Sequence, residues 1–231
     1  MKNGMVILAG GIGKRMNKPI PKQFLILAGK PIIVHVLEKV EQLTDVERVV
    51  ITCPAEYVAQ TQTLLEHRNL AGRFCCIEGG QTRQESVYKG MLELGECENV
   101  VIHEAVRPFV TVAEFRVLID SEYDNVIYGS RIPFTVLAGH EYVEDTLERS
   151  RLVNVQLPQK FNAGQLKAAH DSARAEGRDD FTEDASLLFH YQRSQIRILE
   201  GSERNIKITE PTDLIIGEAI YNEYILGRAQ D

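Results

Sequence analysis

"MVILAGGIGKRMNKPIPKQF", residues 5–24, is the stretch that decides the fold of this 231-residue chain. It opens with an apolar run typical of a buried β-strand, which passes directly into a glycine-rich turn at residues 10–13. Four cations follow within a few residues: Lys14, Arg15, Lys18 and Lys22. Glycine lets backbone N–H groups approach an anion closely, and neighbouring cations then neutralise it. The stretch therefore predicts an α/β protein with an anion-binding site after its first strand.

The chain as a whole is acidic, with a formal net charge of -7, so the basic segment is a local feature. This balance predicts that neither nucleic acid nor a membrane surface is a partner, because both favour a basic face. The opening apolar run is too short for a secretory leader or a membrane span. The four cysteines form no C-x-x-C pair, which is typical of reduced thiols in a cytoplasmic protein without a zinc site.

Outside this stretch, strand and helix patterns alternate along the chain. Short runs rich in β-branched residues predict buried strands at 5–10, 48–52, 74–80, 99–104, 125–130 and 195–201. Helical periodicity predicts helices at 31–43, 54–68, 84–95, 112–121, 163–175, 184–191 and 211–226. The alternation predicts a single domain, residues 1–231, built on an open, mostly parallel α/β sheet. Ligands of such sheets bind at the carboxyl ends of the strands.

Residues 131–160 interrupt this alternation. They contain no clean helix, and β-branched pairs flank a centre rich in glycine and acidic residues. We expect a protruding β-arm here, which is typical of a dimer contact. The alternative is a long surface insertion, but structureless loops of that length are uncommon in compact domains.

The glycine turn does not match the two best-known phosphate-binding patterns. It lacks G-x-x-x-x-G-K-[ST], and Met16 stands where a dinucleotide-binding fingerprint has its third glycine. A plain strand-to-helix turn with a solvated basic face is the simplest alternative. Pro19 and Pro21 favour an extended segment from which Lys22 folds back over the turn. Together with Arg15, this lysine favours a polyphosphate as the anion.

Five motifs, in order and spread over almost the whole chain, resemble those of one enzyme family. They are LAGGIGKRM with PKQF (8–24), GGQTRQESV (79–87), VIHEAVRPFV (101–110), TEDASLL (182–188) and NIKITEPTDL (205–214). The chain thus resembles the cytidylyltransferases that make CDP-methylerythritol and CDP-ribitol. The resemblance implies a Rossmann-like nucleotidyltransferase sheet, CTP and a polyol phosphate as substrates, Mg²⁺ as cofactor, and a homodimer formed through the arm.

The resemblance also implies the roles of individual residues. The catalytic residues would be Arg15, Lys22 and Lys207. The nucleotide-binding residues would be Leu8, Ala9, Gly10, Gly11, Gly13, Gly79, Gly80, Arg83 and Ser86. The residues that bind the acceptor substrate would be Glu104, Arg107, Thr135 and Arg149, with Glu104 also a metal ligand. Arg149 stands where the family's arm reaches into the partner's site.

Several of these residues have a plainer reading from their own chemistry. Ser86, near a predicted helix start, could simply cap the helix, and Arg83 could form a surface ion pair. A buried strand delivers Glu104 to its carboxyl end, where it could reach a metal or form a structural pair with Arg107. Lys207 lies between two isoleucines in a predicted strand and faces away from them, toward either a ligand or solvent.

The substrate side departs from the methylerythritol enzyme at three places. Glu104 follows His103 where the family usually has Asp, Leu137 takes a threonine place and displaces Thr135, and Leu157 begins a usual T-P-Q. These changes leave ribitol phosphate, or another polyol or sugar phosphate, open as the acceptor. A nucleotide-binding regulator without catalysis is the alternative from another class, and three retained cations disfavour it. A Rossmann dehydrogenase is disfavoured by Met16.

Overall fold

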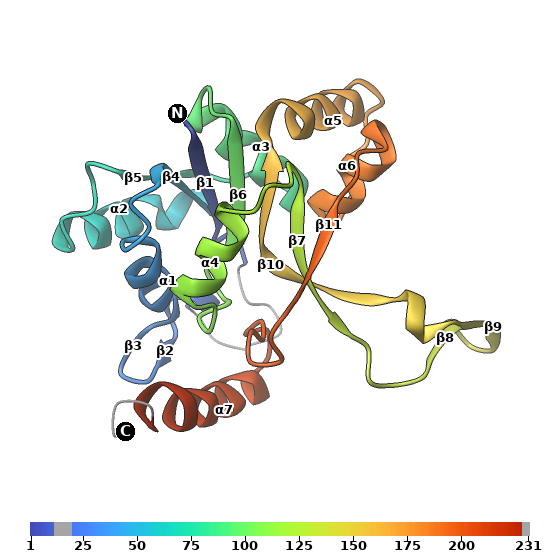
Figure 1. Cartoon of the computed structure of the whole chain (residues 1–231). Coiled ribbons are helices and arrows are strands. Elements are labelled where there is room, and N and C mark those ends of the chain that lie inside the picture. The colour runs from blue at the N-terminus through green and yellow to red at the C-terminus, as the bar shows by residue number, and fades with distance from the viewer. Residues whose placement is uncertain (12–19, 228–231) are drawn as a thin grey trace.

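The structure is a computed structural model that describes residues 1–11 and 20–227. A seven-stranded sheet forms its centre, in the order β11-β7-β10-β6-β1-β4-β5 (Figure 1). The strands are β1 (Asn3–Leu8), β4 (Val46–Cys53), β5 (Phe74–Glu78), β6 (Asn99–Glu104), β7 (Val126–Arg131), β10 (Val153–Asn162) and β11 (Arg197–Glu200). Only β10 runs antiparallel to its neighbours, so the prediction of a mostly parallel sheet is confirmed.

Each of the six strands predicted from apolar, β-branched runs is present, whereas β10 was not predicted. The inner half of β10 buries Gln156, Gln159 and Lys160, so it lacks the apolar run that marks a central strand. Lys160 satisfies its amine by donating to the carbonyls of Ile119 and Ser121 at 3.2 and 2.6 Å. Such contacts with distant backbone are invisible to a local pattern.

Helices cover both faces of the sheet. One face carries α1 (Ile32–Val40), α2 (Val58–His67) and α4 (Val112–Ile119), and the other carries α3 (Arg83–Leu94), α5 (Ala163–Ala175) and α6 (Asp184–Gln192). Alternate residues of β1 divide between the two cores: Met5 and Ile7 face the first, and Val6 and Leu8 face the second. No helix within the described residues has the length and apolarity needed to cross a membrane.

A third, smaller core gathers the segments that carry the site. It joins Leu25 and Leu27, after the basic segment, to Val106 and Phe109 in the turn after β6, and to Ile208. The C-terminal helix α7 (Pro211–Ile220), continued by a π-helical stretch (Tyr221–Leu226), packs against this core. Three chain segments far apart in sequence are thereby held at one end of the sheet.

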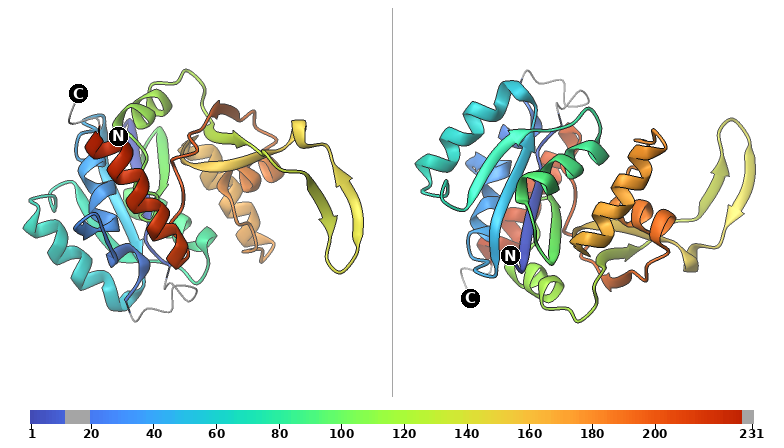
Figure 2. Two further views of the ribbon diagram at one scale, coloured as in Figure 1. Left: turned by 90° about the horizontal axis from the view of Figure 1, so that it is seen from below. Right: turned by 90° about the horizontal axis from the view of Figure 1, so that it is seen from above.

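The predicted arm is present and protrudes from the body (Figures 1 and 2). It is a hairpin of β8 (Val136–Gly139) and β9 (Val143–Leu147), and a 3-10 turn (Arg149–Arg151) follows it. The arm is shorter than the predicted range 131–160, because β10 begins at Val153 and enters the central sheet. Its apolar side chains Phe134 and Tyr142 are 76% and 79% exposed.

Candidate active site

A cavity of about 260 Å³ lies at the carboxyl ends of the parallel strands, and we call it the glycine-loop cavity. The predicted site residues that line it are Leu8, Ala9, Gly10, Gly11, Lys22, Gly80, Arg83, Ser86, Glu104 and Lys207. Its other lining residues, which sequence reasoning did not single out, are Gln23, Gln81, Thr82 and Val106. The predicted residues Gly13 and Arg15 lie outside the described residues.

Lys22 lies beside Gly11, the end of the glycine-rich stretch that the structure describes. It begins a 3-10 turn (Lys22–Phe24), and its side chain is so close to Gly11 that an added Cβ would lie 3.0 Å from the lysine Cε. The next residue, Gln23, donates from Nε2 to the carbonyl oxygen of Ala9 at 2.7 Å. This contact fastens the Lys22–Phe24 turn to the residue after β1, so the lysine is held at the cavity wall.

The loop from Gly80 to Thr82 forms a second wall and is organised by the first turn of α3, whereas the predicted residue Gly79 does not line the cavity. Ser86 Oγ accepts from Gly80 N at 2.9 Å and donates to the Thr82 carbonyl at 2.9 Å. Thr82, not Ser86, caps the helix, since its Oγ1 accepts from Glu85 N. A Cβ atom at Gly80 would overlap the Glu85 side chain, so the loop requires glycine there.

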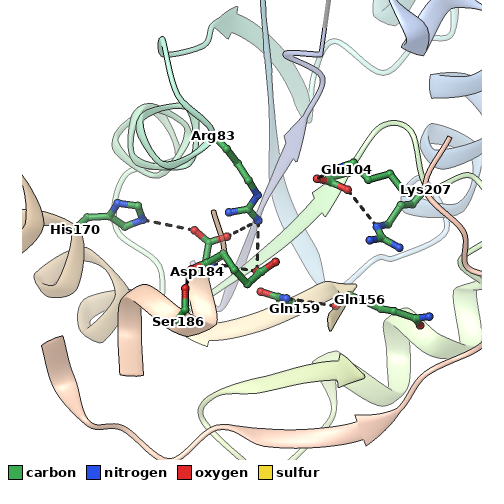
Figure 3. Close-up of polar contacts among 10 residues, drawn as sticks. Arg83, Glu104, Gln156, Gln159, His170, Asp184, Ser186 and Lys207 are labelled. Atoms are coloured by element: carbon green, nitrogen blue, oxygen red, sulfur yellow. Dashed lines mark hydrogen bonds and ion pairs between the residues drawn. The ribbon is translucent and has the colours of Figure 1, made fainter. Parts of the chain in front are cut away.

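Arg83 forms a buried ion pair where a surface pair was the plainer expectation. Its Nη2 lies 2.7 Å from Asp184 Oδ2 (Figure 3 shows Arg83 and Asp184) and 3.7 Å from Glu183 Oε1, at the start of α6. Burial lowers the pKa of Arg83, but the charges of Asp184 and Glu183 outweigh it and raise the pKa overall. Asp184 is only 1% exposed. Asp184 lies in the TEDASLL motif, and this motif is the feature of the sequence that could have indicated a role for it in the site.

Glu104 contacts two cations, Lys207 and Arg107. Its Oε1 accepts from Lys207 Nζ at 2.7 Å, and its Oε2 accepts from Arg107 Nε at 3.1 Å. Burial raises the pKa of this carboxyl, but the charges of Lys207 and Arg107 outweigh burial and lower the pKa to about 2. The structural Glu–Arg pair therefore exists, and Lys207 extends it into the cavity wall (Figure 3 shows Glu104 and Lys207).

The segment that carries Lys207 is not a strand, so that prediction was wrong. Residues 205–209 lie outside the strands of the sheet, and the backbone of Ile208 donates to the Val106 carbonyl at 2.9 Å. The predicted opposite directions of the side chains are still observed. Ile206 and Ile208 pack in the third core, while Lys207 faces the cavity. Burial of the two isoleucines, not strand pairing, sets the direction of the lysine.

A larger cleft of about 790 Å³ lies beside the base of the arm, and we call it the arm-base cleft. Lys207 lines both this cleft and the glycine-loop cavity, and Arg107, Gln156 and Asn205 line the cleft alone. Leu157, at the place of the family threonine, is 2% exposed and packs in the second core, so it does not line the cleft.

Thr135 and Arg149, predicted to bind the acceptor, lie on the arm and are exposed. Neither is among the described residues that line the two cavities of the same chain. Arg149 donates from Nη1 to the Pro133 carbonyl at 2.8 Å. A role for either residue at a site of its own chain thus lacks support from its position.

The residues fit a metal ion that arrives with a nucleotide better than a resident metal ion. Glu104 is the one carboxylate among the described residues that line the glycine-loop cavity, and both its oxygens contact cations. No cluster of three or more His, Cys, Asp or Glu suited to a metal ion occurs in residues 1–11 and 20–227. Mg²⁺ commonly takes one or two carboxylates and fills its coordination with phosphate oxygens and water.

Comparisons with known proteins agree over almost the whole chain. The family model described as 2-C-methyl-D-erythritol 4-phosphate cytidylyltransferase matches residues 4–223. The enzyme of that name from Geobacillus kaustophilus is 37% identical over 218 residues, covering 93% of this chain and 95% of the relative. The chloroplastic enzyme of Oryza sativa subsp. japonica is 32% identical over 227 residues, covering 95% of this chain and 74% of the relative.

Solved structures show the same likeness. The 4-diphosphocytidyl-2C-methyl-D-erythritol synthase of Anaerococcus prevotii superposes with a TM-score of 0.82 at 25% identity, covering 96% of each chain. The 2-C-methyl-D-erythritol 4-phosphate cytidylyltransferase of Francisella tularensis superposes with a TM-score of 0.79 at 26% identity, covering 95% of this chain and 99% of that one.

Proposed function

Because the chain belongs to the 2-C-methyl-D-erythritol 4-phosphate cytidylyltransferase family, we propose that it transfers a cytidylyl group from CTP to 2-C-methyl-D-erythritol 4-phosphate and releases pyrophosphate. The observation that carries the proposal is the place of Lys207, which lines both the glycine-loop cavity and the arm-base cleft. A cation between two adjoining sites suits a reaction between two phosphates.

The proposed reaction needs little acid–base catalysis. A phosphate monoester has a second pKa of about 6, so the acceptor is largely dianionic at neutral pH. The acceptor oxygen attacks the α-phosphorus of CTP, and the bond to the β-phosphate breaks with pyrophosphate as the leaving group. The obstacle is repulsion between two anions, which positioned cations relieve.

The cations divide this work by position. CTP would occupy the glycine-loop cavity, with its base against the loop Gly80–Thr82 and its triphosphate over the glycine turn. Lys22, held over that turn, would bind the triphosphate together with Arg15. The Lys207 amine, which donates to Glu104 in the structure, would turn one of its donors to the α-phosphate. Negative charge grows on that phosphate in the transition state, and the amine would stabilise it.

The acceptor would occupy the arm-base cleft, where Arg107 supplies a further cation. The exposed apolar residues of the arm support a homodimer, because a small exposed hairpin is marginal by itself. In an isologous dimer Arg149 of one chain would reach the acceptor phosphate at the other chain's site. The alternative acceptor, ribitol 5-phosphate, is favoured by no comparison above.

Glu104, together with the phosphates of CTP, would hold a divalent cation, Mg²⁺ in our proposal. Bound there, it would neutralise phosphate charge and orient the triphosphate. A cytoplasmic location is proposed as well, and four unpaired cysteines support it.

The test is a pyrophosphate-release screen of the purified protein with Mg²⁺. CTP, UTP, ATP and GTP are each combined with 2-C-methyl-D-erythritol 4-phosphate, ribitol 5-phosphate and other polyol phosphates. We expect the highest kcat/KM for CTP with the methylerythritol phosphate. Equal turnover of UTP would reject the nucleotide assignment, and a preference for ribitol phosphate would reject the acceptor. Binding of CTP without turnover of any acceptor would favour the non-catalytic regulator.

A further inference from the structure

The backbone around Lys207 is held by side-chain hydrogen bonds and one backbone hydrogen bond in place of a strand ladder. β11 ends at Glu200, and residues 205–209 then cross the end of the sheet outside its strands. The side chain of Lys207 is 39% exposed, so packing does little to fix it. The precision with which the lysine meets a phosphate therefore depends on its partner Glu104 and on what anchors the residues on either side of it.

Asn205 is the anchor on the N-terminal side of Lys207. It is 2% exposed, and its Nδ2 donates to the Leu157 carbonyl in β10 at 2.6 Å. Its own carbonyl accepts from Arg107 Nη1 at 2.9 Å. Asn205 thus joins β10 and the turn after β6 to the segment that carries the lysine.

The amide of Asn205 has one orientation that satisfies these contacts. A flip would place Oδ1 against the Leu157 carbonyl oxygen, so two acceptors would face each other. Gln156 adds a parallel contact one residue earlier in β10, since its Nε2 donates to the Ser202 carbonyl at 2.9 Å. On the C-terminal side, the backbone bond from Ile208 to Val106 completes the support. Lys207 lies between the Asn205 and Ile208 anchors.

We propose that Asn205 is a positioning residue that acts on the reaction through Lys207. The inference rests on the proposed function, in which Lys207 meets the α-phosphate. Without the Asn205 amide, the Leu157 carbonyl loses its donor, and the segment loses the side-chain bond that ties it to β10, although Arg107 still donates to the backbone carbonyl of residue 205. The lysine would then sample more positions, and its contact with the transition state would weaken. CTP binding through Lys22 and the loop Gly80–Thr82 would change little.

The test is a double-mutant cycle between Asn205→Ala and Lys207→Ala. In the wild-type background we expect Asn205→Ala to lower kcat about tenfold, the size of one lost buried hydrogen bond, with KM for CTP within about twofold. In the Lys207→Ala background we expect the same substitution to change kcat less than about twofold, because its effect passes through an absent side chain. Asn205→Ser, which keeps a donor, should recover part of the rate.

A matched control separates loss of position from loss of stability. Asn125 is also buried, at 3% exposure, and its Nδ2 donates to Gln165 Oε1 at 3.0 Å at the opposite end of the sheet. We expect Asn125→Ala to lower the melting temperature while kcat stays at the wild-type value.

The outcomes distinguish this inference from the proposed function. An inactive wild type would defeat the proposed function. An active wild type in which Asn205→Ala is equally harmful with and without Lys207, or harmless in both, would overturn the positioning role alone. An equal loss of kcat in Asn125→Ala would also overturn it, since instability would then explain the effect.

Discussion

Lys207 Nζ lies 2.7 Å from Glu104 Oε1, although 103 positions separate the two residues in the chain. The contact links the end of β6 to the segment before α7. It keeps a buried carboxylate ionised and holds the lysine at the border of the two cavities. In the proposed reaction, an arriving phosphate competes with Glu104 for the same amine.

Replacement of Glu104 tests this relationship. Glu104→Gln keeps the shape of the side chain but leaves Lys207 and Arg107 without their counter-charge. We expect kcat to fall at least about tenfold, because the lysine loses its position. The free energy of unfolding should fall by on the order of 2 kcal/mol, since the partners are partly screened by solvent. Urea denaturation measures the change in stability, and pyrophosphate release measures the change in kcat. An unchanged kcat in Glu104→Gln would contradict the role of Glu104 in positioning Lys207.

Removal of Lys22 tests the cationic wall over the glycine turn. We expect Lys22→Ala to lower turnover at least about tenfold, because it removes a charge from the transferring phosphates, and Arg15→Ala to do the same. Lys167→Ala is the control, since Lys167 pairs with Asp171 at the surface of α5. Near-normal rates in folded Lys22→Ala protein would show that the basic segment is surface charge only.

Arg149 tests the contribution of the arm. If it binds the acceptor's phosphate, Arg149→Ala should raise KM for the polyol phosphate about tenfold and leave KM for CTP nearly unchanged. Steady-state kinetics with each substrate varied in turn would show the difference. A change in KM for CTP alone would contradict the assignment.

The same variant tests whether the site is shared between subunits. Mixing Arg149→Ala with Lys22→Ala protein should restore part of the activity, because a mixed dimer would contain one intact site. Subunit exchange is demonstrated first with differently tagged chains. A monomer in sedimentation, or no recovery after exchange, would reject the shared site.

Removing one partner of the buried pair between Arg83 and Asp184 tests whether buried ion pairs stabilise the fold more than exposed ones do. Asp184→Ala leaves a buried guanidinium without its nearest partner, so we expect a loss of about 3–5 kcal/mol in the free energy of unfolding. Asp180→Ala is the matched control, because its pair with Arg178 is exposed, and it should change stability little. Equal losses in the two variants would show that burial does not set the value of these pairs.

Acid should destabilise the protein through His103 before it affects Glu104. Burial lowers the pKa of His103 to about 3, whereas an unfolded histidine titrates near 6.5. Below about pH 6.5 the unfolded state therefore binds more protons, and stability is lost as pH falls. Glu104, with its pKa lowered to about 2, loses its contribution later, as pH falls below about 4.5.

The histidine contribution can be isolated with one variant. From pH 7 to pH 5 we expect His103→Gln to lose about 2 kcal/mol less stability than the wild type. His35 and His170, whose pKa values burial also lowers, retain their share in both proteins. Urea denaturation at the two pH values gives the comparison, and identical pH dependence in the two proteins would contradict a buried, neutral His103.

Much of the fold follows from the sequence alone. The six apolar strand runs, the seven helices and the arm were predicted, because hydrophobic period and turn residues are local properties. The approach of Lys22 to Gly11 and most lining residues of the glycine-loop cavity were also predicted. These residues adjoin the carboxyl ends of parallel strands, which topology brings together.

The tertiary structure alone decided which distant groups pair. Nothing local in TEDASLL indicates that Asp184 holds Arg83, or that Glu104 holds Lys207. The polar strand β10 and the strandless segment at 205–209 also escaped prediction, because contacts with remote backbone stabilise both. Local patterns report burial and period, whereas an ion pair or a buried amide contact depends on where two distant segments meet.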